Sequence, residues 1–220
     1  MLMAEVCGFG SLFQRVATQL RDLIRANVNS ITHARAVRQL NKQLAASSLD
    51  GGFASTLIIT YFAPTRSLSV CNAGHPPPAI YRKQSDSWSL LKGQPDDSHV
   101  TPTDPSLLEL CEYQQYTTTL QPGDQLVAYS NALTESQDAA GHTMGVDGVL
   151  KRLRQLRASH APSLPRDLLN SIRDARKGNL AKSDATVVLF QATDRTTTWR
   201  DALLAPLRLL GPVNDRTRIN

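Results

Sequence analysis

Near the start of the chain, apolar side chains recur every three or four positions, which is the spacing of amphipathic helices. One stripe covers residues 12–28 and a second covers residues 31–44, with Asn29 and Ser30 as the break between them. The turn-forming segment at residues 47–52 ends this part of the chain. The pattern therefore predicts two helices ahead of the first strand.

The pattern then changes to β-branched, aromatic and alternating positions, which favour strands. It predicts an antiparallel hairpin formed by residues 56–62 and 67–72. More extended segments are expected at residues 79–82, 113–120 and 125–130, where apolar and polar side chains again alternate. The middle of the chain is therefore expected to be mostly antiparallel sheet.

Residues 83–112, in contrast, are polar and rich in turn-forming residues, and we expect loop structure there. Helical spacing returns at residues 149–156 and again at 168–172, and Gly178 is a typical residue for ending the second of these helices. The apolar run at residues 185–190 predicts a strand in the interior of a sheet. This order of helices, antiparallel strands, helices and strand is typical of an α+β protein.

Composition agrees with a folded protein, because 41% of the 220 residues are hydrophobic. No apolar run approaches the roughly 18–20 residues that cross a bilayer, and the first residues lack the basic region of a signal peptide. Cys7, Cys71 and Cys111 have no metal-ligand spacing and are expected to be reduced, buried thiols. We expect a cytoplasmic protein that does not bind membranes.

The formal net charge of +5 is unevenly distributed. Residues 151–182 contain nine lysines and arginines but only two aspartates, Asp167 and Asp174. Such a segment can attract an acidic partner, although a solvated helix surface is the favoured interpretation. No nucleic-acid-binding motif accompanies it, and both tryptophans, Trp88 and Trp199, lie outside it. We therefore expect no nucleic-acid partner.

Several polar residues with catalytic potential have simpler structural interpretations. His75 lies between Gly74 and three prolines, which favours a turn residue over a general acid. Asp124 follows Pro-Gly and is expected in a hairpin turn, and Glu135 is expected to be an exposed carboxylate near a helix. The serine- and threonine-rich runs have no accompanying His and Asp arrangement, so a nucleophilic triad is not supported.

Three segments are more informative when taken together in their order along the chain. They read Asn-Ala-Gly-His-Pro-Pro at residues 72–77, Pro-Gly-Asp-Gln-Leu-Val-Ala-Tyr-Ser-Asn-Ala at 122–132, and Ser-Asp-Ala-Thr at 183–186. These segments resemble the N-A-G-H-P-P turn, the P-G-D…Y-T-D-G segment and the D-D-x-T strand of SpoIIE/RsbU-type protein phosphatases, a branch of the metal-dependent PPM family. The resemblance covers residues 1–192, and residues 193–220 are expected to form a tail with a short amphipathic helix.

The resemblance implies a PPM-type α-β-β-α sandwich, in which two antiparallel sheets are flanked by helices. It also implies a protein serine/threonine phosphatase of signal transduction, acting on a phosphorylated regulatory protein of the anti-anti-sigma type in sigma-factor control. In such enzymes two Mn²⁺ or Mg²⁺ ions activate the attacking water and bind the phosphate. Both ions prefer oxygen ligands, so several aspartates have to converge.

The chain departs from the family at these ligands, which come from two early motifs, G-D-Y-Y-D and G-D-V-x-G-H-G, and from Y-T-D-G and D-D-x-T. Residues 1–5 are expected to follow the second early motif, so that both motifs and the N-terminal strands are missing. Asn131 replaces the aspartate of Y-T-D-G and Ser183 the first aspartate of D-D-x-T, which leaves Asp184 as the weak remaining ligand. Because a unit charge pair at about 4 Å is worth roughly 4 kcal/mol at a dielectric of about 20, metal binding is expected to fall by orders of magnitude.

Three hypotheses follow for the function. The first is a catalytically defective phosphatase-like protein that binds a phosphoprotein, the second is an incomplete chain of an active phosphatase, and the third is a basic interaction module using residues 151–182. Early acidic motifs encoded upstream would favour the second, and a steep salt dependence of binding would favour the third. Uncovered strands at residues 56–62 and 185–190 also predict self-association.

Overall fold

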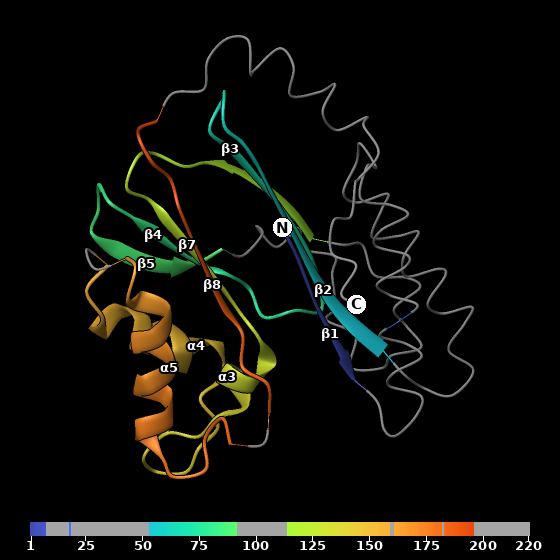
Figure 1. Ribbon diagram of the computed structural model, residues 1–220, viewed down its shortest axis with the longest axis vertical. Helices are drawn as coiled ribbons and strands as arrows, with labels where there is room; N and C mark the ends of the chain where they lie inside the picture. Colours follow the sequence, from blue (N-terminus) through green and yellow to red (C-terminus); the bar gives the residue numbers. More distant parts are fainter. Residues whose placement is uncertain (8–17, 19–52, 92–113, 159–160, 182, 196–220) are drawn as a thin grey trace, which may run out of the picture.

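The computed structural model describes residues 1–7, 18, 53–91, 114–158, 161–181 and 183–195. In this part of the chain two four-stranded sheets face each other, and helices cover the outer face of one of them (Figure 1). All neighbouring strands are antiparallel. The predicted helices at residues 12–28 and 31–44 lie outside the described residues, as do residues 196–220 of the predicted tail.

The first sheet has the strand order β1-β2-β3-β6. Its strands are β1 (Leu2–Cys7), β2 (Phe53–Phe62), β3 (Ser67–Ala73) and β6 (Gln114–Thr119). The predicted hairpin is confirmed, since β2 and β3 pair antiparallel around the turn, and β6 lies within the predicted segment 113–120. Strand β1 was not predicted from the sequence.

The second sheet has the order β5-β4-β7-β8. Its strands are β4 (Ala79–Arg82), β5 (Ser87–Leu90), β7 (Gln125–Tyr129) and β8 (Val187–Gln191). Strand β5 corrects the prediction of loop structure there, because Trp88 alternates with exposed serines and packs beneath a helix. The strand predicted at residues 185–190 is present as β8, which lies at one edge of the sheet that the described residues form, with β5 at the other edge.

Three helices follow β7, and the two longer ones cover one face of the second sheet. They are α3 (Asn131–Glu135), α4 (Gly145–Gln155) and α5 (Leu164–Ala175). The predicted apolar stripes are confirmed, since Val149 and Leu153 on α4 and Leu168 on α5 are buried. The exposed side chains include most of the basic residues of the segment 151–182, so these lie on the solvated helix surface.

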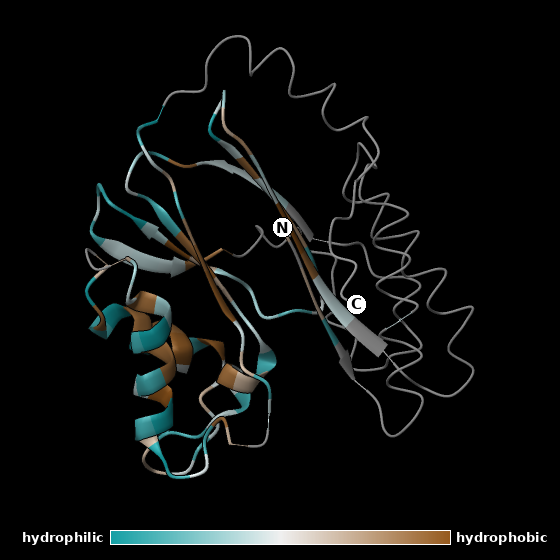
Figure 2. Ribbon diagram, in the orientation of Figure 1, coloured by the Kyte–Doolittle hydropathy of each residue, from teal (hydrophilic) through white to brown (hydrophobic). Residues whose placement is uncertain are grey.

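Two apolar cores result from this arrangement. One lies between the sheets and contains Leu57, Val70 and Leu126, and the other lies between the second sheet and the helices and contains Tyr129 and Leu153. Figure 2 shows the apolar stretches along the strands and on the helix faces turned toward the second sheet. The described residues therefore contain the two sheets and one helix layer of the predicted α-β-β-α sandwich.

Asp124 joins the turns at one end of the sandwich. Its carboxylate accepts hydrogen bonds from the Lys83 and Gln121 backbone N–H groups at 2.9 and 3.0 Å, and from the Arg82 guanidinium at 2.9 Å. Burial alone raises the pKa of Asp124, but these donors outweigh it and hold the pKa below its ordinary value. This network gives Asp124 the turn role that its Pro-Gly context predicts.

Candidate functional site

Three segments far apart in sequence meet near one end of the space between the sheets. They bring together Glu5 of β1, His75 of the turn after β3, and Asn131 at the start of α3. The backbone N–H of Asn131 donates to both carboxylate oxygens of Glu5, at 3.0 Å from each. Because β1 belongs to the first sheet and Asn131 lies two residues after β7 of the second sheet, Glu5 links the two sheets.

The Asn-Ala-Gly-His turn holds His75 in place through the side chain of Asn72. The Asn72 Nδ2 donates to the His75 carbonyl at 2.8 Å, and the His75 N–H donates to Asn72 Oδ1 at 2.9 Å. Between them Gly74 has a φ of 70°, a left-handed conformation that glycine adopts without steric cost. The sequence of this turn therefore fixes a backbone conformation in which the His75 imidazole points toward Glu5.

His75 is buried, and one of its ring nitrogens has no hydrogen-bond partner. Its Nδ1 lies 3.1 Å from the Pro76 carbonyl, so in the neutral ring this nitrogen carries the proton and Nε2 is an acceptor. Nε2 is buried without a hydrogen bond and lies 3.7 Å from Oε2 of Glu5. Burial lowers the pKa of His75 below 6.5, against the opposing effects of the Pro76 carbonyl and the Glu5 charge.

Ser130 connects the same end of the second sheet to the segment that precedes β8. The Ser130 N–H donates to the Thr186 carbonyl at 3.0 Å, and the Thr186 N–H donates to Ser130 Oγ at 3.0 Å. The side chains of Ser183 and Asp184, a few residues before Thr186, are exposed. The structure thus brings Asn131 together with Glu5 and His75, but it shows no contact from Ser183 or Asp184 to that cluster.

The fit of this site to two divalent ions can be tested on its donor atoms. Within the described residues no group of three or more His, Cys, Asp or Glu side chains could hold a metal ion. Both oxygens of Glu5 already accept a hydrogen bond from Asn131, whose own side chain is neutral. Two divalent ions need several converging carboxylates to offset their charge, so the residues present here do not fit a two-ion centre.

Glu5 is the site residue that the sequence prediction missed. The signal was present, because Glu5-Val6-Cys7-Gly8-Phe9-Gly10 has the valine and both glycines of G-D-V-x-G-H-G in register, with Glu5 at the aspartate. The expectation that residues 1–5 follow this motif is therefore corrected by β1, which carries Glu5 to the side of Asn131. Asp184 is then not the only carboxylate left at an expected ligand position.

The family model described as stage II sporulation protein E (SpoIIE) matches residues 1–193. The chain belongs to the SpoIIE family. This confirms the resemblance that its three motifs indicate, and a search of the curated proteins finds no match.

Solved structures show the fold of this SpoIIE-family chain. The RsbU and RsbW domains of Rv1364c from Mycobacterium tuberculosis match at 19% identity and a TM-score of 0.68, over 89% of this chain and 52% of that one. The PP2C phosphatase domain of SpoIIE from Bacillus subtilis, with a fragment of its regulatory domain, matches at 16% and 0.65, over 89% and 55%. The serine/threonine phosphatase PstP with two manganese ions matches at 16% and 0.55, over 88% and 87%.

The chain thus spans about half the length of the first two of these proteins. At these identities the likeness establishes the fold, and the predicted PP2C-type sandwich of two antiparallel sheets with helices is confirmed. No described helix has the length and apolar composition that a membrane crossing needs.

Proposed function

We propose that this SpoIIE-family chain is a serine/threonine phosphatase-like signalling domain that binds a phosphorylated regulatory protein without hydrolysing it. The family match and the fold support the phosphatase-like part of the proposal. The observation that carries the non-catalytic part is the hydrogen bond from the Asn131 backbone N–H to both oxygens of Glu5.

This hydrogen bond matters because a metal-dependent phosphatase uses carboxylates to hold its ions. At an effective dielectric of about 20, each carboxylate at about 4 Å from a divalent ion contributes roughly 8 kcal/mol of attraction before desolvation. The cluster offers one such group, Glu5, and that group is already bound to an N–H donor of its own chain. Neutral Asn131 and Ser183 stand at the two other ligand positions and supply no charge.

The same cluster has a structural use that needs no metal. Glu5 joins β1 to the start of α3, and Ser130 joins the end of β7 to the segment before β8. Both contacts hold the loops at one end of the sandwich, where one residue of each family segment lies, namely His75, Asn131 and Thr186. A preserved loop end of this kind can keep a partner-binding surface after hydrolysis has been lost, and the partner class proposed is an anti-anti-sigma-type phosphoprotein.

The test compares hydrolysis and binding by the same protein. The full chain is assayed with phosphoserine peptides and p-nitrophenyl phosphate in millimolar Mn²⁺, with PstP as the positive control and a chelator in parallel. We expect no chelator-sensitive turnover, and we expect a phosphorylated anti-anti-sigma-type protein to bind in calorimetry more tightly than its unphosphorylated form. Chelator-sensitive turnover would establish an active phosphatase instead, and equal or absent binding of both forms would refute the proposed partner class.

A further inference from the structure

The turn that follows α5 is fixed against the segment that follows α3. The Gln137 N–H donates to Asn179 Oδ1 at 3.0 Å, and Asn179 Nδ2 donates to the carbonyl oxygens of Gln137 and Ile172, each at 2.8 Å. Because α3 begins at Asn131, these bonds place the C-terminal end of α5 at the same end of the sandwich as the contact between Glu5 and Asn131. In Figure 1 the tip of the β1 arrow, α3 and the C-terminal end of α5 all lie toward the bottom.

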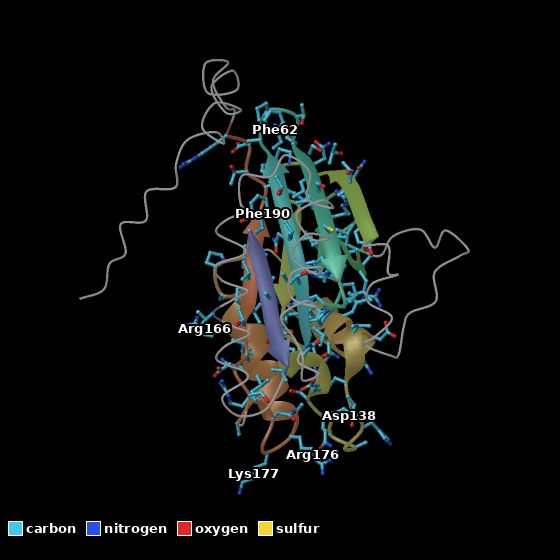
Figure 3. The ribbon with its side chains drawn as sticks, turned by 90° about the vertical axis from the view of Figure 1, so that its right-hand side faces the viewer. Phe62, Asp138, Arg166, Arg176, Lys177 and Phe190 are labelled. Carbon is cyan, nitrogen blue, oxygen red and sulfur yellow. The ribbon has the colours of Figure 1, made fainter. Side chains whose placement is uncertain are left out.

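Three exposed basic residues, Arg173, Arg176 and Lys177, lie at this end of α5. With Asp174 they give residues 173–177 a net charge of +2, from three positive charges and one negative charge. The side chains of Arg176 and Lys177 make no hydrogen bond or ion pair with any other residue that the structure describes. Figure 3 shows both side chains at the lower end of the molecule, pointing away from its body. Their charges are therefore available to a ligand in solution.

The Arg176 guanidinium lies across the backbone of Gly141, in the turn before α4. A β-carbon at position 141 would collide with the guanidinium, so the glycine leaves the space that Arg176 occupies. Gly141 also has a φ of 90°, a conformation that glycine adopts without steric cost. The Asp138 carboxylate of the same turn accepts the His142 N–H at 2.9 Å and lies 3.7 Å from His142 Nδ1. Asp138 is thus bound within its own turn.

Exposed cations with this geometry suit a phosphate group. A guanidinium presents a planar fork of N–H donors that matches two phosphate oxygens, and a lysine adds a compact positive charge. A phosphoserine carries a charge of about −1.5 to −2 at pH 7 and three acceptor oxygens. The residues around Glu5 do not fit two divalent ions, so a phosphate bound at this end of the sandwich has to be recognised by side chains.

We propose that Arg176 and Lys177, with Arg173 beside them, bind the phosphoseryl group of the regulatory partner. This inference rests on the proposed function, because it names the residues that recognise the phosphate of that same partner. Other basic residues on the helices are less suited to this role. Arg154 donates to the Trp88 carbonyl at 3.2 Å, and Arg166 precedes the last residue of α5 by nine residues, which is about 13 Å along a helix axis.

Basic residues at a helix C-terminus can also serve only to offset the helix dipole. That role would change the stability of the protein and leave its affinity for a phosphoprotein unchanged. The two roles are therefore separated by measuring thermal melts and binding on the same variants.

The first experiment measures binding to the full chain by calorimetry, with an anti-anti-sigma-type protein in its phosphorylated and unphosphorylated forms. The test variant combines Arg176→Gln with Lys177→Gln. The control combines Arg157→Gln with Arg166→Gln, which are also exposed and remove the same charge. We expect the test variant to raise the dissociation constant of the phosphorylated form at least about tenfold, and the control to change it less than about twofold. Both proteins should keep the wild-type melting temperature, because exposed side chains are replaced.

A second variant and a second ligand examine the phosphate contact directly. Arg176→Lys keeps the charge and loses the planar fork, so its dissociation constant should lie between those of the wild type and Arg176→Gln. Inorganic phosphate, titrated into the wild-type protein at constant ionic strength, should shift the amide NMR signals of Gly141 and Lys177. The same titration of the test variant should leave the Gly141 signal unchanged.

Each outcome of these experiments decides between the two proposals. If the test variant still binds the phosphorylated form as tightly as the wild type does, or only its melting temperature falls, this inference is overturned and the proposed function stands. If phosphate shifts the Gly141 signal but the wild type binds both forms of the protein equally, the anion site stands and the partner class is refuted. A wild type that responds neither to the phosphoprotein nor to phosphate would overturn both.

Discussion

Replacing Glu5 by glutamine tests whether the link between the two sheets stabilises the fold. The wild-type carboxylate accepts the Asn131 N–H at 3.0 Å from each oxygen, and the Glu5 side chain is 21% exposed. Hydrogen bonds to charged groups contribute about 1.5–3 kcal/mol and neutral ones about 0.5–1.5 kcal/mol. Because glutamine keeps one acceptor oxygen and loses the charge, Glu5→Gln is expected to lower the free energy of unfolding by about 1–2 kcal/mol.

The measurement is equilibrium unfolding in urea at pH 7, with the same denaturant dependence required of both proteins. Glu135→Gln is the control, since Glu135 is an exposed carboxylate at the end of α3 and surface changes of this kind stay within about 0.5 kcal/mol. A cost below about 0.5 kcal/mol for Glu5→Gln would refute the reasoning. It would mean that the free-energy cost of removing the Glu5 carboxylate from water is as large as the stabilisation from its hydrogen bond.

Three further predictions concern the same end of the sandwich and the domain boundary. Burial lowers the pKa of His75 below 6.5, so the unfolded chain takes up a proton at this histidine before the folded chain does. The free energy of unfolding should therefore fall as the pH drops below 6.5. Urea unfolding at a series of pH values should show that this free energy depends less on pH in His75→Gln than in the wild type. Asn131→Asp should lower the melting temperature in a chelator, and a melt that is unchanged would contradict the repulsion expected beside Glu5. Truncation after Thr193, where the family match ends, should leave the cooperative melt unchanged, and a broad transition would show that the tail belongs to the core.

The sequence was sufficient for most strands because alternation reports burial directly. Strands β2, β3, β4 and β7 were all predicted, since each has a pattern that a half-buried or fully buried strand requires. The β5 strand was missed because Trp88 is a single apolar residue among serines, and its burial depends on α4 and on an Arg154 side chain that donates to the Trp88 carbonyl. The residues next to Trp88 in the sequence therefore do not indicate that its side chain is buried.

Neighbour relations were harder to predict than the elements themselves. An apolar run such as residues 185–190 predicts that both faces of a strand are buried, and β8 does pack against both cores. The run does not predict which strands pair with its two backbone edges. The side chains of a strand determine which of its faces are buried, whereas its backbone hydrogen bonds depend on which strand lies beside it in the sheet. The sheet order places β8 at one edge of the sheet that the described residues form, and no local pattern in its sequence indicates this position.

The cluster around Glu5 is consistent with a neutral residue at position 131. The Asn131 N–H lies at hydrogen-bonding distance from the Glu5 carboxylate, so an aspartate at 131 would add a second negative charge on the residue that Glu5 contacts. Two carboxylates this close repel each other unless a cation lies between them. With asparagine at position 131, the Glu5 carboxylate lies beside the Asn131 N–H and the buried, neutral imidazole of His75, and no cation is needed to offset a second negative charge. An asparagine at position 131 therefore avoids this repulsion, and Glu5 can link the two sheets at this point through the Asn131 N–H.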